Sequence, residues 1–472
     1  MLNLVTTHRG PRGIHRRQLL SCGGLAALGA LTGDSAFAVK PNGKTKGFGK
    51  AKSVVLLFAS GGQSQIDMWD PKPKAASHIR GQFKPIGTSL PSVHFTEHMP
   101  QMAKLAERYT VIRSMSHEDL DHGSACYLAL TGHYHAQKSA NPKPRPSDFP
   151  TYGAVLQKIY RSNRFPYDAV HVNGPLFVPR EAGPGQNGGF LGRKYEPLVV
   201  GKVGEKPIAI SGMGAQPGLP PVRLNRRLSL KQSLDRLESH LSRHKPANEL
   251  TTQYQQALQM LGSRRCRQAF DMSEESTKTR NRYGRHRMGQ ACLLARRLVQ
   301  AEVPYINVFL NHNLRGQDFS EDTDAFGWDT HNDIFVMLRD HLMPRFDQAV
   351  SAFLIDLEQR GLLDQTLVVC MGEFGRAPTI KKESGFAGVS PGRKHWAEVY
   401  SIMMAGAGVR AGHIVGASDR LGGSPLTKAF GPWDVAATMY SALGISPAGH
   451  FRDDLDRPFP IATGKPIVEA YG

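Results

Sequence analysis

The stretch from Pro304-Tyr-Ile-Asn-Val-Phe-Leu310 to Thr366-Leu-Val-Val-Cys-Met371 decides the fold. Each end of it is a short, continuous apolar run rich in branched residues, which is typical of a strand buried on both faces of a parallel sheet. Between the two runs, apolar residues recur at helical spacing from Phe335 to Leu357, and Pro344 is expected to kink or split that helix. This order of strand, helix and strand predicts an α/β fold with a doubly wound, mostly parallel sheet.

A polar cluster follows each of these strands. Gly327-Trp-Asp-Thr-His331 comes after the first strand and a polar loop, and Gly372-Glu-Phe-Gly-Arg376 comes directly after the second. The carboxyl ends of parallel strands meet at one edge of a sheet, so Asp329, His331 and Glu373 are expected to lie together. Residues i and i+2 of an extended segment point to the same side, which lets Asp329 and His331 bind one ion.

Two more residues are candidate metal ligands. Asp67 lies in the polar turn after the apolar strand at residues 53–59, where it serves either as a third carboxylate or as a turn former. His395 lies in the glycine-framed segment before the apolar strand at residues 400–405, beside Trp396, which is expected to pack against it. Carboxylates together with two imidazoles suit one or two ions of Zn²⁺, Mn²⁺ or Ca²⁺.

A candidate catalytic segment runs from Ser116 to Ser124. It follows an expected strand at residues 110–115 and precedes a run of small apolar residues that reads as a helix. Free amides and the helix dipole stabilise negative charge at a helix N-terminus, so Ser124 or His122 could act chemically there. The alternative is that Asp121 simply caps the helix.

The first 38 residues have the features of a twin-arginine export signal. Arg16-Arg17 precedes an apolar run to about Leu31, and Ala36-Phe-Ala38 is a small-x-small cleavage site. The chain is therefore expected to be periplasmic or secreted, with a flexible basic leader at 39–52 and one α/β domain at 53–472. Residues 226–302 contain several arginine pairs, and their leucines recur at helical spacing. This segment is expected to form a helical insertion or a layer over the sheet.

The net charge of the chain indicates which kinds of molecule it could bind. The formal net charge is +19, of which the signal contributes +3, so the remaining chain carries about +16. Such a field favours an anionic small molecule or polysaccharide, or equally a solvated basic surface. No basic motif is interleaved with aromatics, so nucleic acid is not expected. No other segment has 18 consecutive apolar residues, so no integral membrane segment is expected after signal cleavage.

Several ordered blocks resemble a known family. They are GGQSQIDMWDPKP, DHGSACYLALTG, GQACLLARRLVQA, GWDTHND, RGLLDQTLVV, GEFGRAPTI and GRKHW. Together they resemble the exported domain-of-unknown-function family 1501 over nearly the whole chain from Ser53. That family is placed in the alkaline-phosphatase-like superfamily, whose members bind one or two metals over a doubly wound sheet and hydrolyse phosphate or sulfate esters.

The resemblance implies an overlay with three departures. Gly61 falls where the superfamily has a metal aspartate, Glu373-Phe374 replaces its aspartate-histidine pair, and His122 falls on its nucleophile, with Ser124 the nearest hydroxyl. The implied function is a metal-dependent sulfatase- or phosphatase-type hydrolase in which Arg376, with Arg393, pairs with substrate oxygens. The alternative is a catalytically degenerate binding protein that keeps a metal or anion pocket.

Overall fold

In a computed structural model of the chain, Pro41–Gly472 forms one compact unit. The structure describes residues 45–160, 162, 164–178, 181–204, 208, 260, 263–311 and 327–472. The expected signal at 1–38, part of the leader and most of residues 226–262 of the expected insertion lie outside these ranges.

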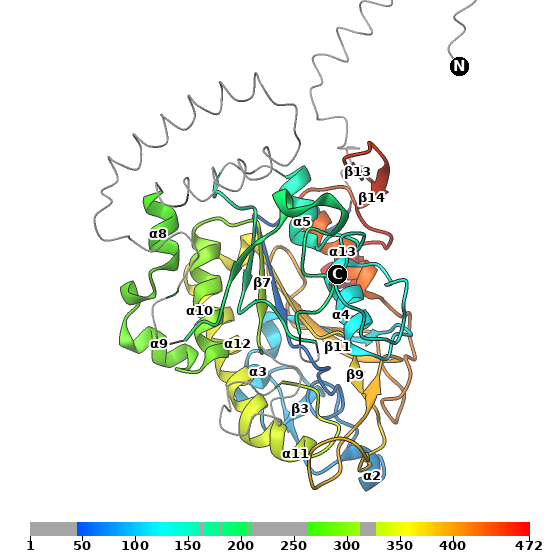
Figure 1. The fold of residues 1–472 in the computed structure, drawn as a ribbon. Coiled ribbons are helices and arrows are strands. Elements are labelled where there is room, and N and C mark those ends of the chain that lie inside the picture. The colour runs from blue at the N-terminus through cyan, green and yellow to red at the C-terminus, as the bar shows by residue number, and fades with distance from the viewer. Residues whose placement is uncertain are drawn as a thin grey trace, which may run out of the picture. The chain divides into compact units, whose positions relative to one another are not determined.

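An eight-stranded sheet forms the centre of the described fold (Figure 1). Strand β11 is antiparallel to both of its neighbours, whereas every other pairing in this sheet is parallel. The mostly parallel sheet expected from the sequence is therefore confirmed. In spatial order the strands are β12 (His413–Val415), β4 (Thr110–Met115), β11 (Tyr400–Ala405), β8 (Thr366–Met371), β1 (Ser53–Phe58), β7 (Tyr305–Phe309), β5 (Ala169–Val172) and β6 (Leu198–Val200).

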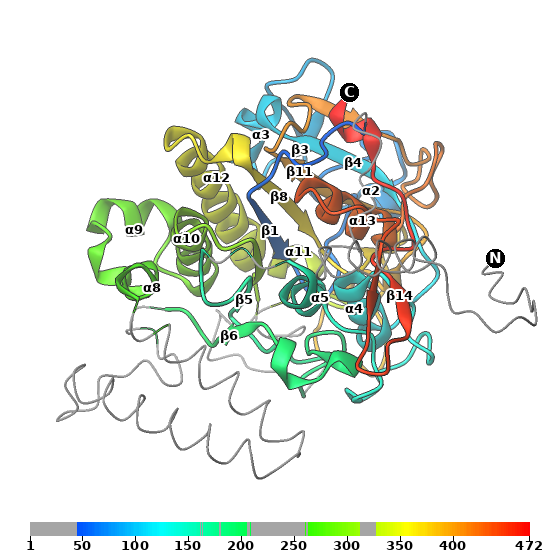
Figure 2. The same ribbon diagram turned by 90° about the horizontal axis from the view of Figure 1, so that it is seen from above.

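Helices cover both faces of the sheet, because the central strands are apolar on both sides. In β1, Val55 and Leu57 join one hydrophobic core, and Leu56 and Phe58 join the other. Figure 2 shows the two helical layers on either side of the strands. The first layer contains α3 (Pro100–Lys104), α8 (Arg264–Phe270), α9 (Thr277–Tyr283), α10 (Arg287–Gln300) and α12 (Met343–Gln359); the second contains α4 (His122–Thr131), α5 (Tyr152–Ile159) and α13 (Pro432–Ala442).

The connection from β7 to β8 contains the expected amphipathic helix, in three parts. It consists of α11 (Ile334–Met337), a π-helical turn η7 (Leu338–Leu342) and α12. Pro344 lies in the first turn of α12, where a missing N–H costs least, so the helix is divided by a π-turn before the proline. The described part of the expected insertion includes α10, which packs directly against β7 and α12 as a layer over the sheet.

A two-stranded ribbon lies next to the sheet and joins the segment after β8 to the segment before β11. It pairs β9 (Gly375–Arg376) with β10 (His395–Trp396), and His395 stands opposite Arg376. The other short ribbons are β2 (Pro85–Gly87) with β3 (His94–Thr96), and β13 (His450–Arg452) with β14 (Pro458–Pro460). The β9–β10 pairing places His395 beside the segment that follows β8.

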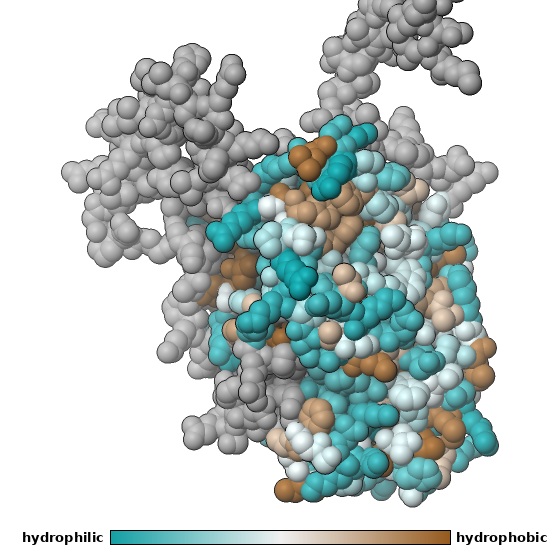
Figure 3. All heavy atoms as spheres, turned by 45° about the vertical axis from the view of Figure 1, so that its right-hand side comes forward, coloured by the Kyte–Doolittle hydropathy of each residue, from teal (hydrophilic) through white to brown (hydrophobic). Residues whose placement is uncertain are grey.

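Hydrophilic side chains predominate on the face shown in Figure 3, with hydrophobic ones in smaller groups. None of the helices in the described ranges is both long and apolar enough to cross a membrane. Inside the fold, four cysteines are buried free thiols: Cys126, Cys266, Cys292 and Cys370.

The ring of Phe346 on α12 links the core to the segment that carries Asp329. It is fully buried and lies edge-on to Trp69 and Trp328, with centroid separations of 5.9 and 5.7 Å. We expect Phe346→Ala to lower the free energy of unfolding by about 3–5 kcal/mol, because the lost phenyl ring leaves a cavity that the alanine side chain cannot fill. Urea denaturation measures the change. The control is Val336→Ala, at an exposed position of α11, and its effect should stay within about 0.5 kcal/mol. Equal effects of the two substitutions would contradict the packing.

Candidate metal centre

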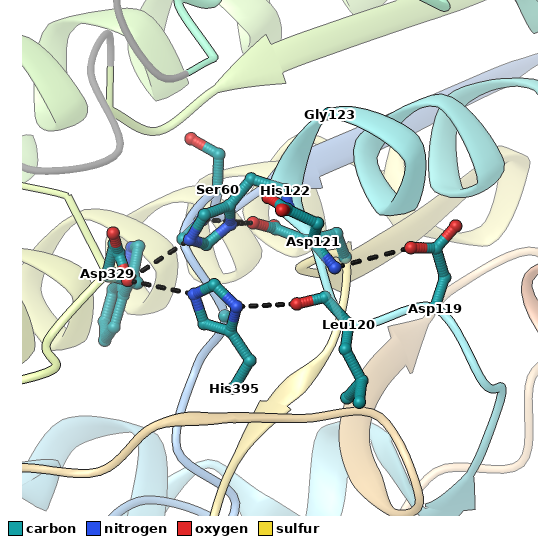
Figure 4. Close-up of polar contacts among 12 residues, drawn as sticks. Ser60, Asp119, Leu120, Asp121, His122, Gly123, Asp329 and His395 are labelled. Carbon is teal, nitrogen blue, oxygen red and sulfur yellow. Dashed lines mark hydrogen bonds and ion pairs between the residues drawn. The ribbon is translucent and has the colours of Figure 1, made fainter. Parts of the chain in front are cut away.

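Four side chains converge at the carboxyl edge of the sheet: His122, Asp329, His331 and His395. Figure 4 shows three of them, His122, Asp329 and His395, pointing toward one another. His122 is the first residue of α4, which follows β4, and His395 lies in β10, just before the antiparallel β11. Asp329 and His331 belong to the connection that follows β7. One ligand atom from each of the four lies within 4.8 Å of every other. Among the described residues this is the group of histidine, cysteine and carboxylate side chains close enough to hold an ion.

The carboxylate of Asp329 is at the centre of the cluster. Its Oδ1 lies 3.2 Å from Nε2 of His122, 3.1 Å from Nε2 of His331 and 3.4 Å from Nε2 of His395. The Nε2 atoms of His331 and His395 are 2.9 Å apart. Ligand atoms of a tetrahedral zinc ion, with bonds of about 2.0–2.1 Å, are separated by roughly 3.3 Å. These four distances are near that value, and all four ligand atoms lie within 4.8 Å of one another, so a small adjustment of the side chains would let the cluster hold one small divalent ion.

Each imidazole of the cluster has a partner for its other nitrogen. Nδ1 of His122 lies 2.6 Å from Oε1 of Glu373, and Nδ1 of His331 lies 3.1 Å from Oε2 of Glu383. Nδ1 of His395 lies 2.7 Å from the carbonyl oxygen of Leu120, as Figure 4 shows. All three partners are acceptors, so each Nδ1 carries a proton and donates it. Metal-binding histidines show this arrangement because it directs the Nε2 lone pair to the ion.

Burial and neighbouring charges set the proton affinities of these groups. Burial lowers the pKa of His122, but Asp329 and Glu373 outweigh it and raise that pKa to about 9. Burial, together with the charges of His122 and Arg376, lowers the pKa of His395 to about 3. Burial alone would raise the pKa of Asp329, but His122 and Arg376 hold that pKa well below its usual range.

The pair His331 and His395 can present two nitrogens to one ion. His395 is neutral at pH 7 and carries its proton on Nδ1, so the Nε2 lone pair faces His331. Nε2 of His331 lies 2.9 Å from Nε2 of His395 and 3.1 Å from Oδ1 of Asp329, so a proton on this nitrogen would hydrogen-bond to these two acceptors. With its proton on the Nδ1 that faces Glu383, His331 would instead direct a second lone pair to the same point, and a divalent ion could bind all three imidazoles together.

Arg376 holds Asp329 in place from behind. Its Nη2 donates to Oδ1 of Asp329 at 2.8 Å and also to the carbonyl of Gly61, while Nε donates to the carbonyl of Gly62 at 3.2 Å and Nη1 to that of Arg393 at 3.2 Å. The guanidinium is fully buried. The predicted role of Arg376 was to pair with substrate oxygens, but the structure commits this side chain to protein groups.

Gly61 explains how the turn after β1 passes so close to Asp329. Its φ is +110°, and a Cβ atom there would lie 2.3 Å from the backbone nitrogen of Asp329. Any side chain at this position would push the two segments apart. The amide of Gly61 donates to Oε1 of Glu373 at 2.8 Å. A backbone group of Gly61 thus lies where, in the sequence overlay, the superfamily has a metal aspartate.

The structure places the other two predicted carboxylate ligands outside the four-residue cluster. Oε1 of Glu373 accepts from His122 and Gly61, so this carboxylate supports a ligand from behind it. Asp67 forms a bidentate ion pair with Arg393, at 2.8 and 3.1 Å, and accepts from the hydroxyl of Ser64 at 2.6 Å. Both partners of that ion pair are fully buried, so Asp67 neutralises Arg393, and Arg393 is committed to protein groups as well.

The candidate nucleophile Ser124 is also committed to protein groups. Its hydroxyl donates to Oδ1 of Asp119 at 2.7 Å and accepts from the amide of Ala140 at 3.1 Å. Asp121 caps α4 by accepting from the amide of His122 at 2.8 Å. The helix N-terminus therefore presents His122 to the cluster as an imidazole ligand, and Ser124 closes the loop before the helix.

Glu383 was missed by the sequence analysis. It lies in Lys381-Lys-Glu-Ser-Gly385, a polar loop with neither apolar periodicity nor ligand spacing. Its position between the His331 and His395 motifs is the one sequence feature that marks it. Phe386, three residues later, stacks on the ring of His331 with centroids 3.7 Å apart.

Fold and site together define an α/β protein with a three-histidine, one-aspartate centre at the carboxyl edge of its sheet. The chain matches the family described as "Protein of unknown function (DUF1501)" over residues 51–470 and belongs to that family. This is the family that the sequence motifs resembled. No curated protein matches the chain significantly.

Among solved structures, the chain is similar to a sulfatase from Pseudoalteromonas sp., with 14% identity over 92% of this chain and 72% of that one, at a TM-score of 0.37. It is also similar to a phosphonate monoester hydrolase from Silicibacter pomeroyi, with 11% identity over 88% and 76% of the two chains, at a TM-score of 0.40. A third is a protein in the alkaline phosphatase superfamily from Vibrio parahaemolyticus, with 11% identity over 89% and 75%, at a TM-score of 0.37.

Asp329 lies in the four-residue cluster, whereas Asp67 is paired with Arg393, so substitutions of the two aspartates should differ in their effect on metal binding. We expect Asp329→Asn to remove bound metal, whereas Asp67→Asn should retain it and lower the free energy of unfolding by about 3–5 kcal/mol, because Arg393 is left buried without its counter-charge. Plasma mass spectrometry of the purified variants gives the metal content, and chemical denaturation gives the stability. A folded Asp67→Asn protein without metal would instead make Asp67 a ligand.

Proposed function

We propose that the chain is an exported, metal-dependent hydrolase of sulfate or phosphate esters that uses one divalent ion. The observation that carries the proposal is the convergence of three Nε2 atoms on Asp329, with each Nδ1 tied to an acceptor. Zn²⁺ and Mn²⁺ suit this imidazole-rich set better than Ca²⁺, which takes six to eight oxygen ligands.

The roles of the residues follow from their contacts. His122, Asp329, His331 and His395 would hold the ion, and the bound ion would supply a Lewis acid for an ester oxygen and for a water nucleophile. Arg376 keeps Asp329 ionised and aimed at the cluster. Glu373 holds the proton of His122 on Nδ1, so His122 can bind through Nε2 once it has given up its second proton.

An anionic substrate, such as a sulfated or phosphorylated polysaccharide or small metabolite, suits the charge of the chain. About +16 remains after the expected signal is removed, and a field of this sign attracts anions over a distance set by the ionic strength. Arg376 and Arg393 are committed to protein groups, so neither guanidinium is offered to a substrate, and the bound ion would supply positive charge to a substrate oxygen.

A second candidate function is an exported binding protein that retains the metal without turnover. The commitments of Ser124 and Arg376 favour it, since the implied nucleophile and the implied anion-binding guanidinium both serve the fold. Metal retention together with saturable binding of a sulfated glycan, but no hydrolysis, would identify this function.

We expect the zinc- or manganese-loaded protein to hydrolyse at least one of an aryl sulfate, a phosphate monoester and a phosphodiester. His331→Ala and His395→Ala should each lose metal and at least roughly 100-fold in kcat/KM, because the ion supplies the Lewis acid. Ser124→Ala is the control on α4 and should keep its metal. No turnover by a metal-loaded wild type would favour the binding protein, and an unchanged metal content in both histidine variants would refute the site.

Export by the twin-arginine pathway is the second part of the proposal. We expect Arg16→Lys combined with Arg17→Lys to leave the protein in the cytoplasm of the expressing bacterium, because the pathway's receptor reads the arginine pair. Cell fractionation and immunoblotting measure the distribution. Arg9→Lys, upstream of the pair, serves as the control and should not change it. Normal export of the double variant would rule out this route.

A further inference from the structure

The loop between the ligands His331 and His395 is bound tightly to the two residues that follow His331. Asn332 donates to the carbonyls of Glu383 and Phe386 at 3.0 and 3.1 Å, and it accepts from the amide of Glu383 at 2.9 Å. Asp333 accepts from the amides of Val389 and Ser390, the latter at 2.6 Å. These bonds fix the loop through its backbone, against the segment that carries His331.

Gly392 closes the same loop. A Cβ atom at Gly392 would lie 2.3 Å from the carbonyl oxygen of His331. The amide of Arg393 donates to the carbonyl of Thr330 at 3.3 Å. The two segments therefore touch along their backbones on both sides of His331, and the loop has little freedom to move away from this ligand.

Two side chains of the loop act on the imidazole of His331. Phe386 stacks on the ring at an interplanar angle of 14°, which fixes the plane of the ring. Oε2 of Glu383 lies 3.1 Å from Nδ1, which fixes the position of the proton. Glu383 bonds to Asn332 through its backbone amide and carbonyl, which leaves its carboxylate available to His331. The side chain of Glu383 is 26% exposed to solvent.

We propose that Glu383 is a positioning residue for the metal centre: it holds the proton of His331 on Nδ1, keeps Nε2 free for the ion and increases its basicity. This inference rests on the proposed function, because it requires the cluster to bind a metal. In this arrangement a carboxylate bonds to Nδ1 of a histidine whose Nε2 would bind the metal. Glu383 and His331 form the partly exposed pair of this kind, and Glu373 and His122 form the buried one. Groups that hydrogen-bond to a metal ligand in this way typically change metal affinity 10- to 100-fold.

The test is a Zn²⁺ titration of the full-length protein in competition with a chromophoric chelator. Glu383→Ala should bind Zn²⁺ about 10- to 100-fold more weakly than the wild type. Glu383→Gln should recover part of the affinity, because its amide oxygen still accepts from Nδ1. The control is Glu398→Gln, an exposed glutamate three residues after His395 in the sequence, which should bind Zn²⁺ as the wild type does.

The unfolding temperature of the metal-free proteins separates positioning from a structural role. The backbone bonds to Asn332 persist without the carboxylate, so the metal-free Glu383→Ala protein should melt with the wild type. Wild-type affinity in Glu383→Ala, or weaker binding matched by a lower metal-free melting temperature, would overturn the inference alone. A folded wild type that binds no Zn²⁺ and no Mn²⁺ would overturn the proposed function and this inference together.

Discussion

The ionised carboxylate of Asp329 is the interaction on which the rest of the site depends. It is almost fully buried, and a carboxylate removed from water is stable only when positive charge and hydrogen-bond donors surround it. Arg376 supplies a permanent charge from one side, and three imidazoles face the same oxygen from the other. In the metal-free protein, protonated His122 completes the balance, and a divalent ion would take over that role.

Much of the surrounding polar structure serves to maintain this arrangement. Arg376 and Arg393 are fully buried. Arg376 donates to the turn after β1 and to the carbonyl of Arg393, and Arg393 forms an ion pair with Asp67 in that turn. Gly61 allows the turn after β1 to approach Asp329 within backbone contact. The two arginines therefore stabilise the fold around the site. From the sequence alone, an arginine with this role cannot be told from one that binds an anionic substrate.

The fold was predictable from local patterns, and the site only in part. Apolar runs marked β1, β7 and β8 because a strand covered on both faces has no polar side. The clusters after those strands marked Asp329, His331 and Glu373 as neighbours, because parallel strands end at one edge. The division of the 334–359 helix by a π-turn was not predictable, since Pro344 signals a disruption without specifying its form.

By itself, the sequence determined the α/β class, the family and the residue types available at the carboxyl edge, because strand periodicity and short motifs are local properties of the chain. The tertiary structure alone decided which of those residues come together in the candidate metal centre. It assigned His122 to the cluster, turned Glu373 and Glu383 into partners of imidazoles, and paired Asp67 with Arg393. These choices depend on contacts between residues more than 50 or even 300 positions apart, to which spacing along the chain gives no guide.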